Sequence, residues 1–112
     1  MGSVVRIFVA APIGWLETEE IQKARDEALR VAKERIRNEM GEEAEIEVLE
    51  STFGAAEGKH PAVYFIGRAI QEMSKADIVL FPKGWEDFKT CRLEFKVAFR
   101  YRLKVMDMGA EG

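Results

Sequence analysis

Glu94 occupies an unusual position for a charged side chain. Each residue of an α-helix turns about 100° from the one before it, so a helix from about Lys89 to Arg102 places Arg92, Lys96 and Arg100 on one polar stripe. Glu94 falls about 160° from that stripe, on the opposite side of the helix. The residues that flank it there are Leu93, Val97 and Tyr101 on one side and Cys91, Phe95 and Ala98 on the other. The pattern therefore places a carboxylate among apolar side chains.

Burying an ionised carboxylate without partners costs free energy. A folded protein therefore pairs such a group, raises its pKa or uses it in chemistry. One interpretation of Glu94 is structural, as a satisfied ion pair or as a negative charge that favours the start of a helix. The other is that Glu94 is a reactive carboxyl group.

Large aromatic rings gather in the loops that follow the predicted strands. The three loops are residues 11–17, 51–60 and 82–89, and the rings are Trp15, Phe53, Trp85 and Phe88. A flat ligand can stack on such rings, and stacking of a base on an aromatic side chain contributes about 1–3 kcal/mol. Alternatively, the rings fasten the loops or a contact between subunits.

The elements that must position these residues alternate between strand and helix patterns. Strands are predicted at residues 4–10, 45–50, 76–81 and 103–106, helices at 18–40, 61–74 and 89–102, and a frayed tail at 109–112. Thr18 is expected to cap the first helix, Gly41 to end it, and Pro61 to occupy a first helical position. This alternation predicts an α/β fold with a parallel sheet and helices on both faces. Ligands of such sheets bind beyond the carboxyl ends of the strands, where the strand order reverses.

Length and composition narrow the classes of function. The 112 residues, 47% apolar and 33% charged, predict a single domain over residues 1–112. The net charge of -3 argues against a nucleic-acid polymer as partner. No apolar run is long enough to span a membrane, and one cysteine and one histidine make a poor metal site and suggest the cytoplasm. Fingerprints of dinucleotide or triphosphate binding are absent, so neither a cofactor nor a metal is expected.

Four segments together resemble the nucleoside 2-deoxyribosyltransferase family, in particular its short, mostly uncharacterised members. They are residues 7–13 (IFVAAPI), 74–81 (SKADIVLF), 84–87 (GWED) and 91–94 (CRLE). The resemblance spans the chain from Arg6 to about Met106. It implies a flavodoxin-like fold of three layers, with about four parallel strands in the order 2-1-3-4. It also implies the cleavage or exchange of the N-glycosidic bond of a nucleoside or nucleoside 5'-monophosphate.

The resemblance also implies roles for particular residues. Glu94 matches the nucleophile that forms a covalent glycosyl-enzyme, and a neighbouring carboxyl, Asp87 or Glu86, is expected to assist it. Lys89, Thr90 and the first amides of their helix are candidates for holding a sugar hydroxyl or a 5'-phosphate. The other candidate substrate-binding residues are Pro12, Ile13, Gly14, Trp15, Phe53, Gly84, Trp85 and Phe88.

The chain departs from the family pattern at three positions. Ala69 stands where members usually carry an Asp that handles the base, and Ala11 and Thr90 replace glycines. An alternative function is therefore a nucleotide-binding or scaffold protein of the same fold that has lost the chemistry. In either case a homodimer or larger homo-oligomer is expected, because the helix around Glu94 has more apolar surface than one sheet can cover.

Overall fold

A four-stranded parallel sheet forms the centre of the molecule. The computed structural model describes residues 4–11, 18–49 and 57–111. The strands are β1 (Val4–Val9), β2 (Glu45–Val48), β3 (Ile78–Phe81) and β4 (Val105–Asp107), in the order β2-β1-β3-β4. All three pairings are parallel, with Ile7 opposite both Val48 and Ile78. The predicted flavodoxin-like α/β fold and its strand order are confirmed.

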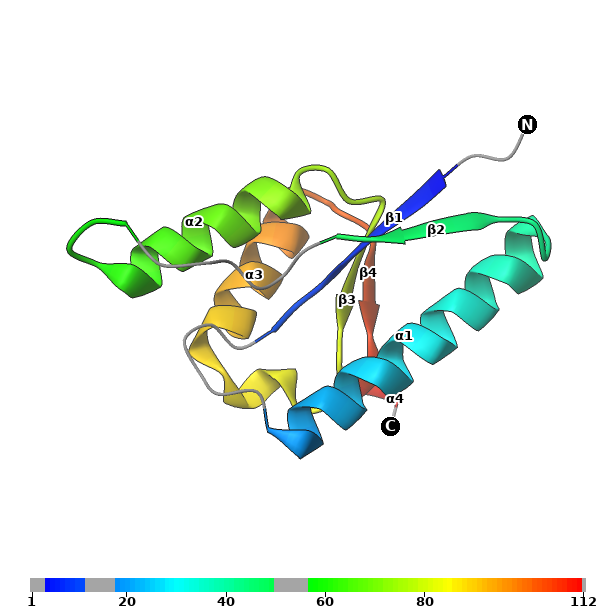
Figure 1. Ribbon diagram of the computed structural model, residues 1–112, viewed down its shortest axis with the longest axis horizontal. Coiled ribbons are helices and arrows are strands. Elements are labelled where there is room, and N and C mark those ends of the chain that lie inside the picture. The colour runs from blue at the N-terminus through cyan, green and yellow to red at the C-terminus, as the bar shows by residue number, and fades with distance from the viewer. Residues whose placement is uncertain (1–3, 12–17, 50–56, 112) are drawn as a thin grey trace.

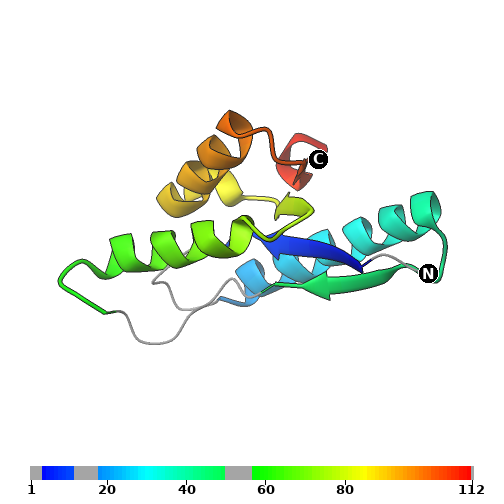
Figure 2. The ribbon, with the colours of Figure 1, turned by 90° about the horizontal axis from the view of Figure 1, so that it is seen from above.

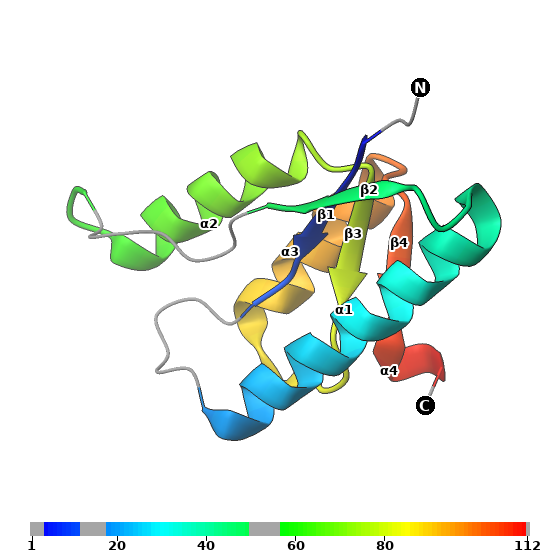
Figure 3. The same ribbon diagram turned by 45° about the vertical axis from the view of Figure 1, so that its right-hand side comes forward.

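Helices cover both faces of this sheet, as Figures 1 and 3 show. Helix α1 (Glu19–Met40) packs on one face, and α2 (Pro61–Met73) and α3 (Lys89–Arg100) pack on the other. Figure 2, a view from above, shows α1 and α2 extending toward opposite ends of the longest axis. Successive side chains of a strand point to opposite faces. Accordingly Ile7 lies in the core under α1 and Phe8 in the core under α2 and α3.

Local signals in the sequence fix the ends of these elements. The Thr18 hydroxyl accepts a hydrogen bond from the Ile21 amide at 3.2 Å, and Gly41, with φ of 102°, ends α1. Pro61 begins α2, where its missing N–H costs nothing. The Asp77 carboxylate accepts a hydrogen bond from the Arg6 amide at 2.7 Å, which ties the start of β3 to β1.

The structure differs from the prediction near the C-terminus. Residues 109–111, which were predicted to fray, are part of a short helix, α4 (Met108–Glu111), because the Asp107 carboxylate accepts a hydrogen bond from the Gly109 amide at 2.9 Å and so caps its first turn. Helix α3 ends at Arg100, before a turn in which Arg102 has a φ of 58°. In the loop after β3, Gly84 at φ 92° precedes a 3-10 turn, η1 (Trp85–Asp87).

The lengths and hydropathies of the helices bear on the membrane prediction. Within residues 4–11, 18–49 and 57–111, none of them combines the length and the apolar character that crossing a bilayer requires. The longest, α1, has a charged outer face that includes an ion pair between Arg30 and Glu27 at 2.6 Å.

Candidate functional site

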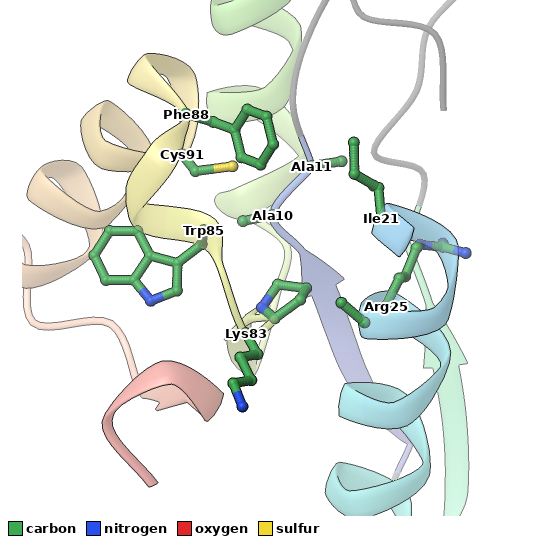
Figure 4. A pocket seen from close by; sticks show the side chains of 10 residues that line it. Ala10, Ala11, Ile21, Arg25, Lys83, Trp85, Phe88 and Cys91 are labelled. Atoms are coloured by element: carbon green, nitrogen blue, oxygen red, sulfur yellow. The ribbon is translucent and has the colours of Figure 1, made fainter. Parts of the chain in front are cut away.

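A small apolar pocket lies at the carboxyl ends of β1 and β3, where the strand order reverses (Figure 4). This is the place at which parallel α/β sheets bind their ligands. The cavity has a volume of about 30 Å³. This is far below the usual range for ligand pockets, about 300–1,000 Å³, so a ligand of ordinary size has to widen it. The wall consists of Ala10, Ala11, Ile21, Ala24, Arg25, Pro82, Lys83, Trp85, Phe88 and Cys91.

Glu94 is fully buried, with an exposed fraction of 0%. Neither of its carboxyl oxygens has a hydrogen-bond partner within the part of the chain that the structure describes. Burial raises the pKa of Glu94 from 4.5 to about 8. The structural interpretation of this residue, as a satisfied ion pair, therefore finds no partner among the described residues. Glu94 lies near the start of α3, but the positive end of the helix dipole does not offset the effect of burial on its pKa.

Cys91 connects Glu94 to the pocket. It stands one helical turn before Glu94 in α3, is buried, and lines the pocket wall, with its sulfur directed toward the end of β1 in Figure 4. Burial and the neighbouring Glu94 charge raise the pKa of the Cys91 thiol to about 12. The thiol is therefore protonated and a poor nucleophile at neutral pH. Glu94 itself is not part of the wall and lies one turn further along the helix.

Trp85 lines the pocket and has the fastening role considered for the loop aromatics. Its ring lines the pocket, and its indole Nε1 donates a hydrogen bond to the Asp107 carboxylate at 2.8 Å. The same ring is stacked on Phe95, with 4.7 Å between ring centroids and 16° between the planes. Trp85 thus fastens the loop after β3 to the end of β4, and this contact fixes one side of the pocket.

We expect Trp85→Phe to lower the free energy of unfolding by about 1–3 kcal/mol, because it removes the indole donor and leaves the partly buried Asp107 carboxylate short of one hydrogen bond. Urea unfolding of the variant measures this. In an Asp107→Ala background the same substitution should cost clearly less. An equal cost in both backgrounds would show that the hydrogen bond contributes nothing.

The structure brings some of the other predicted residues to the pocket and leaves others apart. Phe88 lines the wall, whereas Gly84 and Lys89 are exposed and Thr90 is half-buried. Pro12, Ile13, Gly14, Trp15 and Phe53 lie outside the described residues.

The two carboxyl groups proposed to assist Glu94 are both exposed. A Cβ atom added to Gly109 would lie 3.1 Å from the Glu86 carboxylate, so this side chain turns toward the C-terminal helix. The Glu86 carbonyl also accepts a hydrogen bond from Arg92 at 2.6 Å. Neither Glu86 nor Asp87 lines the pocket.

Sequence reasoning missed the contribution of α1 to the pocket. Its first turns supply Ile21, Ala24 and Arg25. In Figure 4, Ile21 lies beside Ala11 at the end of β1. Arg25 is only partly exposed, unlike most of the charged side chains of this helix. The signal was present in the sequence, because Arg25 adjoins the apolar positions Ile21 and Ala24 on the helical wheel.

Comparisons of the chain with family models, with curated proteins and with solved structures gave no significant match. The family resemblance therefore depends on the sequence motifs described above. The function has to be argued from the pocket and from the carboxyl group of Glu94 behind its wall.

Proposed function

We propose that the protein cleaves or exchanges the N-glycosidic bond of a nucleoside or nucleoside 5'-monophosphate, with Glu94 as the nucleophile. The observation that carries this proposal is a fully buried carboxyl group without a hydrogen-bond partner among the described residues, one helical turn from the wall of a strand-end pocket. Such a group destabilises the fold and is expected where it reacts. The motif residues 91–94 give the same assignment.

The reaction follows the scheme of retaining glycosyl transfer. A Glu94 oxygen forms a bond to the anomeric carbon while the bond from that carbon to the base nitrogen breaks. The electron pair of the broken bond goes to the base, which takes up a proton. Water or a second base then attacks the anomeric carbon and frees the carboxylate. For the proton donor, Asp87 is the better of the two candidates, since the Glu86 side chain turns toward Gly109.

The lining of the pocket suits the base of such a substrate. Trp85 and Phe88 contribute aromatic rings, and Ala10, Ala11 and Pro82 leave the wall between them apolar. A planar base can lie against such a surface, with its sugar toward α3. To bring the anomeric carbon to Glu94, the substrate must displace the Cys91 side chain or pass beside it.

A chromatographic assay for free base tests the activity. The wild-type protein is incubated with a set of nucleosides and 5'-monophosphates, with and without an added second base. Release of base alone indicates hydrolysis, and formation of a new nucleoside indicates transfer. If no substrate in the set yields free base or an exchanged nucleoside, the proposed chemistry is wrong.

The pH dependence of kcat/KM tests the protonation state of Glu94. A nucleophilic carboxyl must be ionised, and burial raises the pKa of Glu94 to about 8 in the free protein. We therefore expect the pH profile of kcat/KM to contain an ionisation near pH 8 that Glu94→Gln removes. A wild-type profile without an ionisation near pH 8 would contradict the proposed state of Glu94.

A second candidate function is nucleotide binding without catalysis. Two observations favour it: Glu94 is behind the pocket wall rather than on it, and Ala69, at the position of the family Asp, is buried in the core with an exposed fraction of 1%. A nucleotide that raises the unfolding temperature without any turnover would support this function. Any cleavage of the glycosidic bond would exclude it.

We also propose that the protein is a homodimer in the cytoplasm. Val63 on α2 and Leu93 on α3 expose 66% and 44% of their surfaces, and a second copy would cover such apolar side chains. The buried, unpaired thiol of Cys91 suits a reducing compartment. Light scattering should show a dimer that Val63→Glu weakens. A monomer at all working concentrations would contradict the proposal.

A further inference from the structure

Three aromatic rings form a column that ends at the protein surface. Trp85 stacks on Phe95, and Phe95 is nearly parallel to Phe99, with 6.4 Å between centroids and 11° between planes. The inner end of the column is held by the hydrogen bond from Trp85 to Asp107. The outer ring, Phe99, is 76% exposed, which is unusual for a side chain of this size. The column therefore presents a flat, apolar ring to solvent.

A shallow hollow of about 400 Å³ surrounds this ring at the C-terminal end of α3. Lys96, Val97, Phe99, Arg100 and Tyr101 line it. Tyr101 adds a second aromatic side chain that is 73% exposed. The hollow thus combines two accessible rings with two cations, and it is separate from the pocket at the strand ends.

The segment that carries the hollow has a net charge opposite in sign to that of the whole chain. Residues 83–104 carry seven basic and three acidic side chains, a net charge of +4, whereas the rest, with ten basic and seventeen acidic ones, carries -7. Lys96, Arg100 and Arg102 are exposed. They form no ion pair with other residues in the described ranges. Their positive field is therefore available to an anionic partner.

We propose that this surface binds single-stranded nucleic acid. Unpaired bases stack on Phe99 and Tyr101, while phosphates contact Lys96, Arg100 and Arg102. This combination of exposed rings with cations is the usual means of binding single strands without sequence preference. The argument from net charge against a nucleic-acid polymer does not hold here, because the acidic side chains lie mainly outside residues 83–104.

Two other occupants fit this surface less well. A second copy in a two-fold contact would bring Lys96 and Arg100 close to their own symmetry mates, and like charges repel. An anionic membrane would satisfy the cations, but it offers no planar group to continue a column of parallel rings. A duplex keeps its bases stacked on one another and cannot present them to Phe99.

Fluorescence anisotropy at low salt tests the proposal with two matched ligands. One is a labelled oligothymidylate of about ten nucleotides, a length within the site sizes of single-strand-binding folds. The other is an abasic strand with the same number of phosphates. We expect the abasic strand to bind at least about tenfold more weakly, since each stacked base contributes an affinity factor of this order.

Variants separate the contribution of the rings from that of the charges. Phe99→Ala and Tyr101→Ala should each weaken oligothymidylate binding about tenfold and leave the salt dependence unchanged. Lys96→Gln and Arg100→Gln should each lower the slope of log affinity against log salt by about 0.7. Met40→Ala and Lys59→Gln are the controls on exposed positions elsewhere, and binding should be unchanged in both. Circular dichroism verifies the fold of every variant.

Three results would overturn the proposal. The first is equal affinity for the oligothymidylate and the abasic strand, because the rings would then contribute nothing. The second is the absence of oligothymidylate binding at low salt. The third is displacement of the bound oligothymidylate by anionic phospholipid vesicles at a much lower phosphate concentration than by unlabelled single strands, which would assign the surface to a membrane. Because Glu94→Gln leaves this surface intact, its binding of oligothymidylate should equal that of the wild type whether or not the proposed glycosidic activity exists.

Discussion

The Glu94→Gln variant is expected to release base from its substrate at least about a thousandfold more slowly than the wild type, because the group that attacks the anomeric carbon is removed. Glutamine has nearly the same shape as glutamate, so the packing around α3 is preserved. The amide is neutral and cannot form the glycosyl ester. Initial rates of base release, measured by chromatography on the best substrate of the screen, provide the comparison.

Glu34→Gln, the same change on the exposed face of α1, is the matched control and should leave the rate unchanged. The residual rate of Glu94→Gln should not show the ionisation near pH 8 that we expect for the wild type. Wild-type rates in the Glu94→Gln variant would exclude Glu94 as the nucleophile. The resemblance to the deoxyribosyltransferases would then concern the fold alone.

The stability of the wild-type protein is expected to fall as the pH rises from 4.5 to about 8. Within this range the unfolded chain has lost the Glu94 proton while the folded protein keeps it, so deprotonation favours unfolding. The free energy of unfolding should decrease by about 1.4 kcal/mol per pH unit, or on the order of 5 kcal/mol in total. Below 4.5 and above about 8, Glu94 contributes no further dependence on pH.

Urea unfolding at several pH values measures this effect against two variants. Glu94→Gln removes the titrating group, so its stability should vary much less between pH 5 and 8. Glu94→Met replaces the carboxyl with an apolar group of similar size, and it should exceed the wild type at pH 8 by several kcal/mol. The same variant should be inactive, a gain of stability at the expense of function. Parallel stability curves for the wild type and Glu94→Gln would show that Glu94 has an ordinary pKa in the folded protein.

The sequence was sufficient to predict the sheet and the position of Glu94. Strand and helix patterns are local, and signals such as Thr18, Gly41 and Pro61 mark the ends of helices directly. The helical wheel placed Glu94 opposite the basic stripe, and the structure buries it completely. The wheel was less accurate for Tyr101, which was grouped with the apolar flank and is 73% exposed, because α3 ends at Arg100.

Other features depend on contacts between distant segments, which a local pattern does not contain. The hydrogen bond from Trp85 to Asp107 joins residues that are 22 positions apart, and the same carboxylate oxygen accepts the hydrogen bond from the Gly109 amide that caps α4. The contribution of α1 to the pocket wall depends on how that helix packs on the sheet, which the sequence of the helix alone does not specify. Glu86 is close to Glu94 in the sequence, which suggested that it is a catalytic partner. Its side chain, however, turns toward Gly109.

Mass spectrometry of the acid-quenched reaction tests most directly whether Glu94 attacks the sugar. During turnover we predict that the peptide containing Glu94 gains the mass of one glycosyl group, and that the gain is lost when a second base is added in excess. The Glu94→Gln variant should carry no such mass. Steady release of base with the sugar attached to another residue, such as Asp87, would contradict the account.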